Sequence, residues 1–152
     1  MGILEKIHSA LSPRVRLLDQ LARSAGRFET LASNLKHDAE LCTYPNLKAG
    51  LERLAAAETR QANILRELLL ARGVWPKTPD TSARVGSSNW ERLNASLALQ
   101  VHLLRDLNLE IAEWERLDPA LADRLREFAA EEDRNLAELR DLTLRCDPQA
   151  LD

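Results

Sequence analysis

The spacing of apolar residues is the feature that most constrains how this chain can fold. In four long stretches they recur alternately three and four positions apart, a period that places them along one face of an α-helix. Such stripes are buried most simply when several helices pack side by side. The 152 residues include only five Gly and six Pro, and 45% are hydrophobic, as in long-helix proteins. We therefore expect one all-α, four-helix domain.

Capping residues set the ends of the predicted helices. Ser12-Pro13 and Asp118-Pro119 each place a capping side chain before a proline at the first helical position. Ser88 and Glu91 form a capping box, and Gly73 is typical of the position just beyond a helix end. The predicted helices cover residues 13–42, 46–72, 89–117 and 119–146.

One connection is much longer than the others. Residues 73–88 show no helical period, and when extended they could span about 50 Å. This length predicts a crossover that runs along the bundle between the second and third helices. We expect Val74 and Trp75 to hold the crossover against the bundle.

The N-terminal residues 1–12 form a separate amphipathic segment ahead of the four-helix domain of residues 13–152. We expect its apolar residues to pack on the domain, because the charges within this segment make it a poor signal peptide. These apolar residues are Ile3, Leu4, Ile7 and Leu11.

Polar residues interrupt three of the four stripes at mid-length. The second helix holds Glu58 and Gln61 there, the third holds Gln100, and the fourth holds Glu132 and Asn135. The stripes of these three helices comprise Leu47, Leu51, Leu54, Glu58, Gln61, Leu65 and Leu68; Trp90, Leu93, Leu97, Gln100, Leu104, Leu107, Ile111 and Trp114; and Leu121, Leu125, Phe128, Glu132, Asn135, Leu139 and Leu142.

The second and fourth helices also repeat one another. LERLAAAETRQANILREL starts at residue 51 and LREFAAEEDRNLAELRDL at residue 125. When the two are aligned, Glu58 meets Glu132 and Gln61 meets Asn135. Shared heptads would align the leucines by chance, but they would not align the polar pair as well. The repeat indicates two helical hairpins of common origin.

With this repeat, crossover and polar mid-section, the chain resembles the ferritin-like superfamily, which includes rubrerythrins and bacterioferritins. The resemblance covers nearly the whole chain after the N-terminal segment. It implies a di-iron or di-manganese site at mid-bundle, with one Glu from each of the first and third helices and a Glu-x-x-His pair from each of the others.

The ligands of that family are only partly present. Gln61 and Asn135 stand at the two histidine positions, and Gln100 stands where the third helix would carry a carboxylate. On the first helix the candidate positions hold Leu21, Ser24 or Ala25, whereas the carboxylates Asp19 and Glu29 fall off the inward stripe.

Two hypotheses for the polar section follow. One is a hydrogen-bonded layer without metal or other cofactor, in which Glu58 or Glu132 keeps its proton. In that case the protein is a non-catalytic structural or interaction protein. The alternative is a carboxylate oxidoreductase or iron-storage-type protein with a reduced site that binds iron or manganese weakly. Its candidate ligands are Glu58, Gln61, Gln100, Glu132 and Asn135. Two carboxylates supply less charge than two divalent ions need, so we favour the first hypothesis.

Charge and composition restrict the partners. A net charge of −3 with no basic block argues against nucleic acid, and no apolar run is long enough to span a membrane. We expect a cytoplasmic protein, with Cys42 and Cys146 at the same end of the bundle but not disulfide-bonded. His37 and Glu40 share a face and could in principle hold a metal, but a solvated helix end with Asp38 is the preferred interpretation.

Excess apolar surface suggests a homodimer through helix faces. Residues 96–104 leave few polar positions, because Leu99, Val101 and Leu103 add to the stripe, and residues 64–71 are similarly broad. Deeper burial within one chain is the equally weighted alternative.

Overall fold

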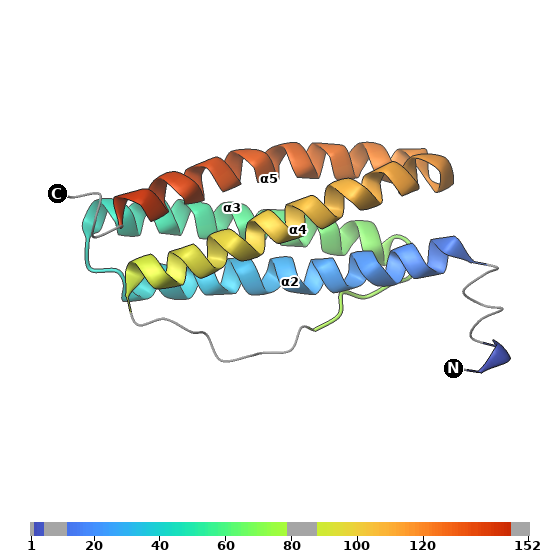
Figure 1. Ribbon diagram of the computed structural model, residues 1–152, viewed down its shortest axis with the longest axis horizontal. Helices are drawn as coiled ribbons and strands as arrows, with labels where there is room; N and C mark the ends of the chain where they lie inside the picture. Colours follow the sequence, from blue (N-terminus) through green and yellow to red (C-terminus); the bar gives the residue numbers. More distant parts are fainter. Residues whose placement is uncertain (1, 5–11, 79–87, 147–152) are drawn as a thin grey trace.

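The computed structural model describes residues 2–4, 12–78 and 88–146, and it shows a bundle of four long helices (Figure 1). No strand occurs in these ranges. The helices are α2 (Pro13–Leu41), α3 (Pro45–Leu70), α4 (Asn89–Leu117) and α5 (Pro119–Arg145). The prediction of an all-α four-helix bundle is confirmed, and each helix end lies within two residues of its predicted place.

The predicted caps are formed by the expected side chains. Ser88 Oγ accepts a hydrogen bond from Glu91 N at 3.1 Å, and Asp118 Oδ1 accepts one from Leu121 N at 3.1 Å. At the end of α3, Gly73 has a φ of 73° and Val74 N donates to Leu69 O at 3.0 Å. This αL turn closes the helix with a glycine, which adopts positive φ without steric cost.

The helices pack as two hairpins laid against each other. α2 pairs with α3 and α4 with α5, while α2 also packs on α4 and α3 on α5. In Figure 1, α3 and α4 run in the same direction along the bundle, opposite to α2 and α5. All four packed pairs are therefore antiparallel, and the two parallel pairs lie on the diagonals.

The predicted crossover is described only at its start, because residues 79–87 lie outside the described ranges. Val74 packs against the core as expected, but Trp75 is 68% exposed, so its predicted anchoring role is wrong. Lys77 attaches this segment to α2 instead. Its backbone N donates to Ala22 O at 2.9 Å, and its ammonium pairs with Asp19.

The described part of the N-terminal segment does not pack on the bundle. Ile3 and Leu4 are 77% and 82% exposed, which contradicts the expectation for these two residues. Ile7 and Leu11 lie outside the described residues.

The core follows the predicted stripes with small shifts. Leu68, Trp90 and Leu97 are only partly buried, while Leu69 and Ser96 are buried in places the stripe did not predict. A straight α-helix has 3.6 residues per turn, so a stripe with a period of 3.5 drifts away from the buried face with distance from its middle. The buried position shifts to the preceding residue before the middle and to the following residue after it.

Cys42 and Cys146 meet the topology prediction. α2 and α5 end at the same end of the bundle (Figure 1), where Cys42 is buried and Cys146 half-buried. Burial and the neighbouring Cys42 raise the pKa of the Cys146 thiol, and both cysteines are free. None of the described helices is apolar over enough of its length to cross a membrane.

Candidate functional site

The five predicted polar residues meet in one layer across the middle of the bundle. Glu58 and Gln61 come from α3, Gln100 from α4, and Glu132 and Asn135 from α5. None is more than 4% exposed. We call these five residues the polar layer. Its members are inside because each occupies a stripe position of its helix, where leucine would otherwise stand.

The repeat is visible as a reciprocal exchange of hydrogen bonds between α3 and α5. Gln61 Nε2 donates to Glu132 Oε1 at 3.2 Å, and Asn135 Nδ2 donates to Glu58 Oε1 at 3.0 Å. Each amide therefore binds the carboxyl group of the other repeat. The longer Gln61 side chain also donates to the backbone O of Phe128 at 2.9 Å.

Gln100 joins the two carboxyl groups from α4. Its Nε2 atom donates to Glu58 Oε1 at 2.8 Å and to Glu132 Oε2 at 2.9 Å. Since an amide nitrogen carries two hydrogens, these two bonds use its full donor capacity.

The hydrogen bonds distinguish the two carboxyl groups. Glu132 accepts an amide N–H at each oxygen, as an ionised carboxylate can. Glu58 accepts two amide hydrogen bonds at Oε1, while its solvent-shielded Oε2 accepts none from the described residues. This pattern fits a carboxylic acid whose proton is on Oε2.

Electrostatics places the proton on the same residue. Burial, the charge of Glu132 and a hydrogen bond with that carboxylate raise the pKa of Glu58 to about 10. Burial also raises the pKa of Glu132, although hydrogen bonds from Glu58, Gln100 and Gln61 oppose the shift. We therefore assign one proton to the pair at neutral pH, located on Glu58.

Helix α2, the one helix that contributes no residue to the layer, has apolar side chains at the corresponding buried positions. Leu21 and Ala25 of α2 are buried, and no described α2 residue donates a hydrogen bond to the five polar side chains. Phe28 of α2 packs edge-to-face on Phe128 at a centroid distance of 5.1 Å. Phe128 lies one turn before Glu132, so this aromatic pair helps to exclude water from the layer.

The charged neighbours of the layer point away from it, as predicted. Arg60 and Arg134 are exposed, and Arg134 pairs with Glu131 on its own helix. Asp19 pairs with Arg23 at 3.0 Å and lies at the surface. Within the described ranges no basic side chain pairs with the two glutamates, so amide hydrogen bonds and the shared proton stabilise them.

These residues do not fit a di-metal centre. Among the residues that the structure describes, no group of three or more His, Cys, Asp or Glu side chains is placed to hold a metal ion. The amide nitrogens already face the carboxyl oxygens that would have to bind metal. Two divalent ions would be short of both charge and ligand atoms.

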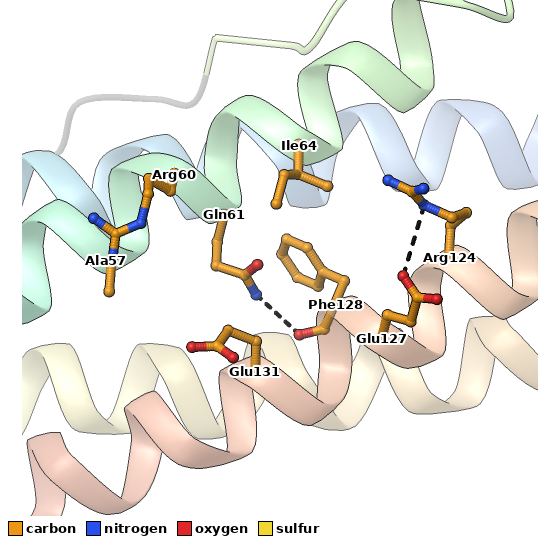
Figure 2. A pocket seen from close by; sticks show the side chains of 8 residues that line it. All are labelled: Ala57, Arg60, Gln61, Ile64, Arg124, Glu127, Phe128 and Glu131. Carbon is orange, nitrogen blue, oxygen red and sulfur yellow. Dashed lines mark hydrogen bonds and ion pairs between the residues drawn. The ribbon is translucent and has the colours of Figure 1, made fainter.

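A groove between α3 and α5 leads from the surface to the edge of the layer (Figure 2). It has a volume of about 310 Å³, and Gln61 and Phe128 form its floor. In Figure 2, the Gln61 amide points at the α5 backbone, where it donates to Phe128 O. The lining residues are Ala57, Arg60, Gln61, Ile64, Arg124, Glu127, Phe128 and Glu131.

The second metal candidate from the sequence is a surface pair. His37 Nδ1 lies 3.9 Å from Glu40 Oε2 with both side chains exposed. The expectation that Asp38 is solvated is wrong: Asp38 is only 2% exposed and lies 3.5 Å from Arg92 of α4. This ion pair depends on how α2 packs against α4, which the helical period alone does not predict.

Glu110 is a buried carboxyl group that the sequence analysis missed. It is 9% exposed, and its Oε2 atom has no hydrogen-bond partner among the described residues. The available signal was its position three residues after Leu107 and next to Ile111, on the edge of the α4 stripe.

No protein-family model matches the chain, and no curated protein matches its sequence.

Proposed function

We propose that the protein is a ferritin-like bundle that has lost its di-metal centre and acts as a non-catalytic structural or interaction protein. The ferritin-like assignment is supported by the helix packing, the polar layer and the repeat of α3 in α5. The observation that carries the functional proposal is the saturation of Glu132 and of Glu58 Oε1 by amide donors from three side chains.

A layer of this kind has a structural use. Its hydrogen bonds form only when α3, α4 and α5 are in register, since a shift of one helical turn would place polar groups against leucine. Buried amides fix the register of coiled coils in the same manner, at some cost in stability.

The proposed setting is the cytoplasm, and the proposed partner is a second copy of the chain. Apolar side chains remain exposed on α4, where Val101 is 41% and Leu109 is 68% exposed. Leu70 at the end of α3 is 38% exposed. A helix-on-helix contact with another copy would cover such residues.

Metal analysis tests the functional proposal. The protein would be purified without chelator, incubated with Fe²⁺ or Mn²⁺ and dialysed before elemental analysis. We expect a substoichiometric metal content that does not change in the Glu132→Gln variant. One or two ions retained per chain, and lost in that variant, would show instead that the reduced site still binds metal.

A further inference from the structure

A pocket at the α2–α4 interface lies apart from the polar layer. It has a volume of about 380 Å³, within the roughly 300–1,000 Å³ typical of small-molecule sites. We call it the α2–α4 pocket. Its α2 wall consists of Gln20, Arg23, Ser24 and Arg27, and its α4 wall of Asp106, Leu109, Glu110 and Glu113.

The buried group on the α4 wall is Glu110, which is 9% exposed and has a solvent-shielded Oε2 atom without a partner in the described residues. A buried polar atom without a hydrogen bond costs folding free energy. Burial and the negative charges of Asp106 and Glu113 raise the pKa of Glu110 to about 7. This side chain is therefore poorly satisfied by the protein alone.

A complementary charge lies on the α2 wall. Arg27 is half-buried, and its guanidinium group forms no ion pair or hydrogen bond with the described part of the chain. Its neighbour Arg23 is more exposed and pairs with Asp19. Arg27 and Glu110 thus line one pocket without pairing with each other.

We propose that the α2–α4 pocket binds a small zwitterion, namely a free amino acid with an uncharged side chain, whose ammonium group binds Glu110 and whose carboxylate binds Arg27. Leu109 borders the pocket at its exposed rim.

The charge pattern selects this class of ligand over singly charged ones. A simple anion would face three carboxyl groups on α4, and a simple cation would face two arginines on α2. A zwitterion puts each of its charges beside the opposite charge. A divalent metal ion is disfavoured because the described residues contain no suitable ligand group.

The ionisation of Glu110 makes binding depend on pH. Asp106 and Glu113 on α4 act on this carboxyl group by their charges, and Arg23 and Arg27 line the opposite, α2 wall of the pocket. Glu110 must be ionised to bind an ammonium group, so affinity should fall as the pH drops below about 7.

The direct test is a titration of the ¹⁵N-labelled protein with leucine, followed by NMR. We expect saturable shifts at α2 and α4 residues around the pocket. Pentylamine and pentanoate, each of which carries one of the two charges, should bind at least tenfold more weakly. Equal binding of either analogue, or no saturable shift with leucine, would overturn the proposal.

Two variants locate the site. Glu110→Gln and Arg27→Gln should each weaken leucine binding at least tenfold, while the surface controls Glu67→Gln and Arg140→Gln should leave it unchanged. If Glu110→Gln does not fold, Arg27→Gln carries the test, because its half-buried side chain can be replaced without opening the core. Unchanged leucine binding in folded Arg27→Gln would refute the site. The outcome is independent of the polar layer and of its metal content.

Discussion

At the scale of single residues, the two buried glutamates have different roles despite their equivalent places in the repeat. Glu58 Oε1 accepts two amide hydrogen bonds and its Oε2 accepts none from the part of the chain that the structure describes, whereas Glu132 accepts one at each oxygen. The proton on Glu58 completes this arrangement, because it gives the layer a donor where a second carboxylate would add repulsion.

This difference predicts unequal effects of the same substitution. In Glu58→Gln, the amide oxygen can accept from Gln100 and Asn135 while its nitrogen donates toward Glu132. We therefore expect its free energy of unfolding at pH 7 to stay within about 1 kcal/mol of the parent or to rise. In Glu132→Gln, a new N–H₂ group faces existing donors, so we expect a loss of about 1–3 kcal/mol. Urea unfolding of both variants gives the comparison, and equal losses would contradict the proton assignment.

The raised pKa of Glu58 also predicts how stability changes with pH. The folded state keeps a proton that the unfolded state releases above its ordinary value of 4.5, so stability falls as the pH rises toward about 10. The slope reaches at most about 1.4 kcal/mol per pH unit for one proton. Between about pH 8 and 9 the contribution of Glu110 to the pH dependence is largely complete, because its carboxyl group is then ionised in both states. Glu58→Gln should flatten the slope in this window, as measured by urea unfolding at several pH values.

The five layer residues could be predicted from the sequence, because each interrupts a stripe at a position that the helical period marks as buried. The position of the proton could not, since it depends on which oxygen each amide reaches. Glu110 was missed for a related reason: it lies beside Ile111, and the period alone does not decide which of two adjacent residues turns inward.

At the scale of helices, their ends were predictable because local side chains set them. Ser88 and Asp118 cap within their own turns, so no tertiary information was needed. Trp75 was misplaced because its environment depends on the path of a connection that has no period. The Asp38–Arg92 pair likewise requires the α2–α4 packing.

Asp118 is the helix cap with the most tertiary contacts. It caps α5, accepts a hydrogen bond from Arg72 Nε at 3.0 Å and lies 3.6 Å from Arg14 Nη2. Partial burial opposes ionisation, but the hydrogen bonds from Arg72 and Leu121 and the two nearby guanidinium groups outweigh it and lower the pKa of Asp118. The turn between α4 and α5 is thus tied to the ends of α3 and α2.

Two substitutions of Asp118 should separate the stability that comes from helix capping from the stability that comes from the ion pairs. We expect Asp118→Ala to lose about 1–2 kcal/mol of stability, and Asp118→Asn to lose less because asparagine also caps helices. The contribution of the Asp118 carboxylate to folding stability is complete above its ordinary pKa of 3.8. It disappears as the pH falls through the lowered pKa of the folded state. Thermal unfolding at pH 7 ranks the two variants, and a stability of Asp118→Ala equal to the parent would rule out this role.

At the scale of the whole molecule, the sequence predicted four helices and their packing class, because the long connection and the repeat restrict the topology. It did not decide how much of the broad apolar surface is buried within one chain. The structure divides that surface: Leu103 is buried in the core, Leu99 is partly buried, and Val101 remains 41% exposed.

The proposed homodimer gives this exposed surface a partner. Val101→Glu combined with Leu109→Glu should weaken self-association at least tenfold, because two charges would be placed in an apolar contact. Ala137→Glu on the exposed face of α5 is the matched control. Sedimentation equilibrium measures the dissociation constants, and a monomeric parent protein would refute the dimer.

The central claim is that the two carboxyl groups of the polar layer need no metal, because amide donors bind them and they share one proton. The most direct test is a ¹³C NMR titration of the glutamate carboxyl carbons, assigned with Glu58→Gln. We predict that at pH 7 the Glu58 carbon has the chemical shift of a protonated acid and the Glu132 carbon that of a carboxylate. Two ionised carboxylates at pH 7 would contradict the account.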